Sequence, residues 1–233
     1  MREIVLDTET TGFDPLQGDR IVEIGCVELM NHLPTGTVYH QYINPERNMP
    51  DEAFKVHGLS NEFLADKPVF AEIVADFRAF IGDSPLVIHN AEFDMKFINA
   101  EFARLGFPAL PMSRSIDTVV MARKKFPGSP ANLDALCRRF EIDNTNRTLH
   151  GALLDSELLA EVYLQLIGGR QPGFELGLGA GKAGSQVQVV RERREPRPHA
   201  ALPEELEAHA AFVGKLKKAI WLREPEPAEE KAG

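Results

Sequence analysis

Two carboxylates stand close together at the end of the first apolar stretch of the chain. In IVLDTETTG, alternation along a β-strand places Asp7 and Glu9 on the same face as Val5. Two like charges at the edge of a core repel each other and are costly to remove from water unless a cation neutralises them. The pair therefore predicts a cation site, although taken alone it is also compatible with a solvated strand end.

Two further acids occupy places where helices are expected. Asp155 falls on one helical line with Leu159 and Val162, so it continues a stripe that faces the core. A lone carboxylate there should meet an arginine, a backbone donor or a metal ion. Asp94 falls in the first turn of a helix that Asn90 can cap, a place where acids are common because they complement the helix dipole.

Together these acids form a donor set made of oxygen atoms alone: Asp7, Glu9, Asp94 and Asp155. Such a set suits Mg²⁺ or Mn²⁺, whereas zinc favours histidine and cysteine. His150 comes just before the helix of Asp155, in TLHGALLDS, where it can turn back toward the acids. Beside cations, a neutral imidazole can take a proton from water near neutral pH, although a lone histidine is often structural.

The elements that must position these residues alternate along the first 168 residues. Strands are expected over residues 3–9, 20–29, 37–45, 85–90 and 115–118, and helices over 69–81, 92–105, 116–124, 133–140 and 151–167. Early strands followed by alternating helices and strands predict an α/β domain, with a mixed sheet and helices on its faces.

The composition is that of an ordinary soluble globular protein. The chain has 233 residues, of which 43% are hydrophobic and 26% charged, and this excludes a disordered or fibrous protein. Its two cysteines, Cys26 and Cys137, lie in apolar contexts, which favours a reducing compartment. Acids replace the apolar run of a signal peptide, and no apolar run reaches the ~18 residues of a membrane span. We expect a cytoplasmic protein.

The net charge limits how this chain could bind nucleic acid. The 26 basic and 35 acidic residues give a formal net charge of −9. This excludes a reader that presents a broadly basic surface and binds phosphates by counterion release. Positive charge for any nucleic-acid contact must come from another source, such as bound cations.

The last third of the chain has a different organisation. Residues 169–200 are rich in Gly, Gln, Arg and Pro and predict a flexible linker, and residues 224–233 predict a disordered acidic tail. Between them, residues 201–223 predict an amphipathic helical segment whose apolar positions are Leu206, Val213, Leu216, Ile220 and Trp221. So short a helix is marginal alone, so it should dock either on the first domain or on another protein.

The three acidic motifs resemble those of the DEDDh exonuclease family. DTETTG carries Asp7 and Glu9, HNAEFD carries Asp94, and HGALLD carries His150 and Asp155 in the family's order and with its five-residue step. Residues 1 to about 168 further resemble its proofreading branch, which works with bacterial replicative polymerases. The resemblance implies an RNase H-like fold and a 3′→5′ exonuclease. The four carboxylates would hold two divalent cations, and His150 would activate the attacking water.

The resemblance also implies how substrate and partners bind. Asp7, Glu9 and Asp155 would meet the 3′-terminal nucleotide at the cations, and Thr10, Glu52 and His57 would contact it through backbone, sugar and base respectively. The segment over 201–223 resembles the part that binds the polymerase alpha subunit. A small theta-like subunit binds some relatives and is a possible further partner.

Three alternatives stay open at this point. The same site would serve an RNA-trimming exonuclease or a DNA-repair exonuclease outside the replisome. The linker and apolar helix favour a polymerase-tethered enzyme over a free-standing RNase. A catalytically silent adaptor is the non-enzyme alternative, but all five candidate catalytic positions carry competent residues.

Overall fold

The computed structural model describes residues 1–145, 147, 149–168 and 201–216. These residues belong to two compact units, one made by residues 1–168 and the other containing residues 201–216. Among the described residues, no helix is both long and apolar enough to cross a membrane.

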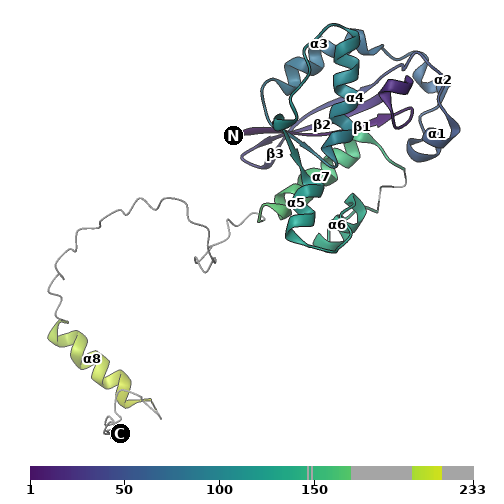
Figure 1. The fold of residues 1–233 in the computed structure, drawn as a ribbon. Helices are drawn as coiled ribbons and strands as arrows, with labels where there is room; N and C mark the ends of the chain where they lie inside the picture. Colours follow the sequence, from purple (N-terminus) through teal and green to yellow (C-terminus); the bar gives the residue numbers. More distant parts are fainter. Residues whose placement is uncertain (146, 148, 169–200, 217–233) are drawn as a thin grey trace, which may run out of the picture. The chain divides into compact units, whose positions relative to one another are not determined.

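The first unit is built on a five-stranded sheet (Figure 1). Its strands are β1 (Arg2–Thr10), β2 (Ile21–Met30), β3 (Leu33–Tyr42), β4 (Leu86–Ile88) and β5 (Ser115–Asp117), in the order β3-β2-β1-β4-β5. The first three strands form an antiparallel meander, and β4 and β5 run parallel to β1. The predicted mixed α/β sheet is therefore confirmed, with β1 at its centre.

Helices cover both faces of this sheet. The α-helices of this unit are α1 (Asp51–His57), α2 (Asn61–Leu64), α3 (Phe70–Ile81), α4 (Ala91–Arg104), α5 (Thr118–Lys125), α6 (Leu133–Phe140) and α7 (Ala152–Leu166), of which α3 to α7 pack on the two faces. Ile4 and Leu6 of β1 pack in one cluster with residues of α3 and α4. Val5, from the opposite face, packs in a second cluster with residues of α5, α6 and α7. Because β1 is buried on both sides, its apolar run is almost unbroken until Asp7.

The segment between β3 and α3 differs from the sequence prediction. It contains α1 and α2, which were not predicted because each is too short to show an apolar period. Acids fill the first turn of α1, and Gly58 ends it with a left-handed conformation at φ 74°. Strand β3 begins at Leu33 and ends at Tyr42, four residues before the expected start and three before the expected end.

The connection from β4 to α4 corrects one local prediction. Asn90 stands at the N-cap of α4, but its side chain makes no capping hydrogen bond, and its backbone is left-handed at φ 71°. Instead, Asp117 accepts a hydrogen bond from the backbone N–H of Ala91 at 3.0 Å. The cap comes from the end of the neighbouring strand β5, which sequence distance hides.

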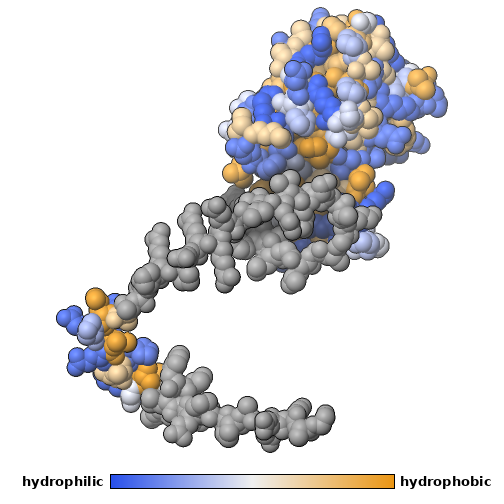
Figure 2. Space-filling view, turned by 60° about the vertical axis from the view of Figure 1, so that its left-hand side comes forward, coloured by the Kyte–Doolittle hydropathy of each residue, from blue (hydrophilic) through white to orange (hydrophobic). Residues whose placement is uncertain are grey.

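The second unit contains helix α8 (Pro203–Gly214). Leu206 and Phe212 are about three-fifths exposed on it, at 58% and 62%, whereas Val213 is buried. Figure 2 shows apolar and polar side chains next to each other on this helix. The helix ends at Gly214, so Leu216 lies beyond it and does not extend its apolar stripe as predicted. The predictions for Ile220, Trp221, the linker over 169–200 and the tail over 224–233 lie outside the described residues.

Candidate active site

The candidate site lies where the carboxyl ends of two neighbouring parallel strands meet. Ile4 and Val5 of β1 pair with Leu86 and Val87 of β4, so the residues after both strands reach the same edge of the sheet. A cleft of about 930 Å³ opens there. It is lined by every residue predicted to bind cations or substrate, namely Asp7, Glu9, Thr10, Glu52, His57, Asp94, His150 and Asp155.

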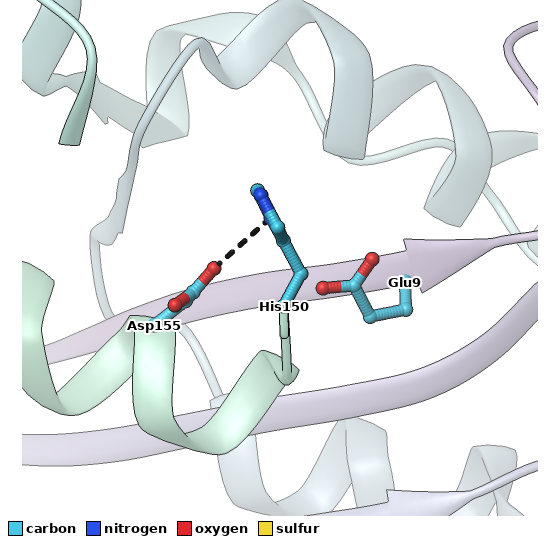
Figure 3. Close-up of side chains that lie close together, drawn as sticks. All are labelled: Glu9, His150 and Asp155. Atoms are coloured by element: carbon cyan, nitrogen blue, oxygen red, sulfur yellow. Dashed lines mark ion pairs between the residues drawn. The ribbon is translucent and has the colours of Figure 1, made fainter. Parts of the chain in front are cut away.

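Three of these residues form the tightest group in the cleft. Glu9, His150 and Asp155 each offer an atom that lies within 4.8 Å of the other two. Figure 3 shows Glu9 reaching the group from β1, and His150 and Asp155 reaching it from the start of α7. The Nδ1 atom of His150 lies 3.4 Å from Oδ2 of Asp155. Asp7 and Asp94 line the same cleft outside this group.

A close approach between α7 and the sheet places Asp155 beside the acids of β1. Gly25 of β2 pairs directly with Asp7, and the hydroxyl of Ser156 donates to the Gly25 carbonyl at 2.9 Å. A Cβ atom at position 25 would lie 2.2 Å from the backbone of Ala152, so only glycine allows this contact. The helix that carries Asp155 is therefore held against the strand opposite Asp7.

Asp94 reaches the cleft from the other face of the sheet. It is buried in the first turn of α4, and the hydroxyl of Thr8 donates to its Oδ1 at 2.7 Å. Thr8 points away from Asp7 and Glu9 along β1, as the strand alternation predicts. The site therefore wraps around the end of one strand, with acids supplied from both sides of it.

His150 is held by its backbone while its ring stays accessible. Its N–H donates to the carbonyl of Val56 in α1 at 3.1 Å, and its side chain is 49% exposed. A long-range contact to α1 thus fixes the segment before α7. The ring stands at the mouth of the cleft, where a water molecule can reach it.

Burial and mutual repulsion disfavour the charged forms of most of these acids. Burial, with repulsion from Asp94 and Glu9, raises the pKa of Asp7 well above its usual value. Burial, with repulsion from Asp155, raises the pKa of Glu9 to about 8, and burial raises that of Asp94 to about 7. A divalent cation would reverse these shifts, so this buried oxygen-donor set fits such a cation.

The comparison with known proteins assigns the family. Residues 4–163 match the family model described as Exonuclease. DNA polymerase III subunit epsilon of Rickettsia conorii is 51% identical over 227 residues, covering 95% of this chain and 99% of that protein. The chain belongs to the DNA polymerase III epsilon subunit family. The epsilon subunit of Escherichia coli K12, at 45% identity over 230 residues, covers 93% of this chain and 94% of its own. The predicted family is confirmed.

Solved structures share the fold of this epsilon-family chain. Exonuclease X in complex with 5′ overhanging duplex DNA matches with a TM-score of 0.55 at 24% identity, over 70% of this chain and 90% of that one. The nuclease domain of 3′hExo, a DEDDh family member bound to rAMP, matches with a TM-score of 0.60 at 20% identity, over 71% and 91%. At these identities the match supports the exonuclease fold.

The three other residues predicted to contact the nucleotide also line the cleft of this epsilon-family chain. Thr10 donates its hydroxyl to the carbonyl of Gly12 at 2.6 Å, which shapes the turn after β1. Glu52 is exposed in the first turn of α1, and His57 is buried at its end. Nδ1 of His57 accepts from the backbone of Leu59 at 3.1 Å, so its hydrogen is on Nε2, which has no partner among the described residues.

Sequence reasoning missed two residues that touch the acids. Arg147 donates to both oxygens of Asp155. The sequence predicted an arginine, a backbone donor or a metal ion as the partner of Asp155, and the structure shows the arginine. The sequence feature that could have indicated Arg147 is its position in RTLHGALLD, three residues before His150. The sequence indicates Thr8 less clearly, because strand alternation predicts which face of β1 it occupies but not which residue it contacts.

The raised pKa values predict how pH affects the metal-free epsilon-family chain. We expect its melting temperature to fall between about pH 5 and pH 8. Folded Glu9 and Asp94 keep protons up to about pH 8 and pH 7, whereas unfolded carboxylates release them near pH 4. The unfolded state therefore binds fewer protons in this window, and rising pH favours it. Thermal unfolding in a chelator measures this slope.

Two additions make that measurement decisive. Saturating Mg²⁺ or Mn²⁺ should remove most of the slope, because a bound cation replaces the protons. Replacing Glu9 with Gln should flatten the slope without metal. A metal-free melting temperature that rises or stays constant over this window contradicts the assignment of Glu9 and Asp94.

Proposed function

We propose that this chain is the proofreading 3′→5′ exonuclease subunit of a bacterial replicative DNA polymerase. The proposal is carried by the meeting of four carboxylates and His150 in one cleft of an epsilon-family chain. Asp7, Glu9, Asp94 and Asp155 would hold two divalent cations, Mg²⁺ or Mn²⁺. Bound cations supply positive charge for the phosphate and lower the pKa of water.

The side chains of this chain orient the substrate and move the proton. His150, half exposed beside Asp155, takes a proton from the attacking water. The hydrogen bond from the Thr8 hydroxyl holds the Asp94 carboxylate in position when cations and substrate bind in the cleft. At the 3′-terminal nucleotide, Glu52 binds the sugar hydroxyl, the backbone at Thr10 contacts the nucleotide, and His57 packs near the base.

The metal site also accounts for the acidic composition. A chain with net charge −9 has little attraction for duplex DNA. Cations held in the cleft would provide local positive charge for one phosphate. A polymerase that is already bound to the DNA supplies the remaining affinity for the substrate. Removal of mispaired terminal nucleotides thus needs a tether rather than a basic surface.

Release of mononucleotides from the 3′ end tests the proposal. The full chain with Mg²⁺ or Mn²⁺ should shorten a 5′-labelled single-stranded DNA oligonucleotide from its 3′ end, and a chelator should stop it. No release by a folded sample contradicts an exonuclease and favours the silent adaptor. Faster trimming of the matched RNA oligonucleotide favours the RNA-trimming alternative.

The tether is proposed to be the C-terminal segment, which binds the polymerase alpha subunit. Leu206 and Phe212 present apolar surface on α8, whereas Val213 is buried. Leu216, Ile220 and Trp221 belong to the same proposed contact. We expect Leu206→Glu combined with Phe212→Glu to abolish co-purification with the alpha subunit, because charge at both positions opposes burial in a partner groove. Cleavage of free oligonucleotides should not change.

The matched control alters exposed acids of the same helix. Glu204→Gln combined with Glu207→Gln leaves the apolar positions intact and should leave co-purification unchanged. Co-purification that survives the Leu206 and Phe212 changes removes α8 from the tether.

A further inference from the structure

The positively charged guanidinium of Arg147 lies in the candidate metal site. Its side chain is 8% exposed and that of Asp155 is 4% exposed. Nε lies 2.5 Å from Oδ1 of Asp155, and Nη2 lies 2.7 Å from Oδ2, so the guanidinium grips both carboxylate oxygens. Such a fork is the strongest pairing that an arginine makes with a carboxylate.

The same guanidinium is held by two further contacts. Nη1 donates to Oδ1 of Asp134, in the first turn of α6, at 2.9 Å. Nη2 also lies 3.0 Å from Nδ1 of His150. One arginine thus connects Asp155 with α6 and with His150.

Asp155 differs electrostatically from the other acids of the cleft. Arg147 donates to both oxygens of Asp155. Asp94 accepts instead from the neutral hydroxyl of Thr8. In the metal-free chain, therefore, Asp155 is a candidate ligand whose charge a guanidinium already balances.

A cation that binds Asp155 must share its oxygens with this guanidinium or displace it. Both oxygens already accept from Arg147, and a divalent cation a few ångströms from a guanidinium is repelled by it. Asp134, which is 46% exposed, gives the guanidinium a second partner outside the candidate ligand set. The guanidinium can therefore keep its hydrogen bond to Asp134 when Asp155 binds a cation instead.

We propose that Arg147 is the internal counterion of Asp155 in the metal-free chain and competes with divalent cations for this carboxylate. This inference rests on the proposed metal site. It makes Arg147 a residue that sets metal affinity, stabilising the empty site and weakening the loaded one. A purely structural ion pair would instead stabilise both forms equally.

Titration of the full chain with Mn²⁺ by calorimetry tests the inference. In Arg147→Gln the competitor is gone, so the Kd for Mn²⁺ should fall by about tenfold or more. Arg147→Lys keeps the charge and loses the fork, so its Kd should lie between those of Arg147→Gln and the unchanged chain, and this variant avoids leaving Asp155 uncompensated. Melting temperatures in a chelator and in Mn²⁺ give a second readout. The deficit of Arg147→Gln in the chelator should shrink when Mn²⁺ is added.

Arg20 provides a matched control away from the acids. It forms the same kind of fork with buried Glu101, with Nε 2.6 Å from Oε1 and Nη2 3.0 Å from Oε2. Arg20→Gln should lower the melting temperature equally with and without Mn²⁺ and leave the Kd unchanged.

The outcomes separate this inference from the proposed function. If the unchanged chain binds no Mn²⁺, both are contradicted. If it binds Mn²⁺ and the affinity is unchanged or weaker in both Arg147 variants, only the competition is contradicted. In that case Arg147 supports the site as a structural residue.

Discussion

The chain carrying Asp7→Ala and Glu9→Ala is expected to stay folded and to cleave DNA about 10³-fold or more slowly than the unchanged chain. Both acids are candidate cation ligands at the end of β1, so their removal takes away charge that the reaction needs. Folding survives because the pKa values of both side chains are raised by burial and repulsion, which means that the folded chain accommodates their charges poorly. Without metal, the double variant should melt no lower than the unchanged chain near pH 8.

Single-turnover cleavage and thermal unfolding measure the two halves of this expectation. Glu28→Gln is the control, since Glu28 is an acid of the same sheet that pairs with Arg2 away from the cleft. It should leave the cleavage rate unchanged. Substantial cleavage by the double variant means that the active site lies elsewhere on the chain.

The His150→Ala variant is expected to cleave about 10²-fold or more slowly while still binding cations. His150 is half exposed, so water can reach its ring, and its Nδ1 lies 3.4 Å from Oδ2 of Asp155. Its loss leaves all four carboxylates in place, so the Kd for Mn²⁺ should change little. The pH dependence of the cleavage rate should also change, because the proposed proton acceptor is gone.

His32→Gln is the comparison for this variant. His32 contacts buried Glu3 through Nδ1 at 2.7 Å and does not line the cleft. Its replacement tests whether loss of any histidine paired with an acid slows the reaction. A pH–rate profile that is the same with and without His150 removes this residue from the role of base.

Local periodicity placed three of the candidate cation ligands on their elements. The two-residue period of a strand put Asp7 and Glu9 on one face, and the helical line put Asp155 on a buried face, because both periods follow from backbone geometry alone. The structure brings these acids to one cleft, together with Asp94 and His150. Each of these predictions used the backbone period of a single strand or helix, so none required knowing which distant residues pack together.

Contacts between elements could not be predicted in the same way. The approach of Ala152 to Gly25 depends on where α7 crosses β2, and the pairing of Thr8 with Asp94 depends on how α4 meets the end of β1. The short helix α1 gave no apolar period, yet its Val56 carbonyl holds the backbone of His150. These contacts join residues far apart in the chain, so no local pattern records them.

By itself, the sequence determined which residue types could bind cations, which faces of their elements they occupy, and the α/β class, because these follow from composition and local backbone period. Only the tertiary structure decided what those residues meet. For Asp155, the sequence was compatible with an arginine, a backbone donor or a metal ion, and packing placed the guanidinium of Arg147 across both oxygens. Arg147 belongs to the segment between α6 and α7, so its partner was decided by how those helices pack and not by any repeat in the chain.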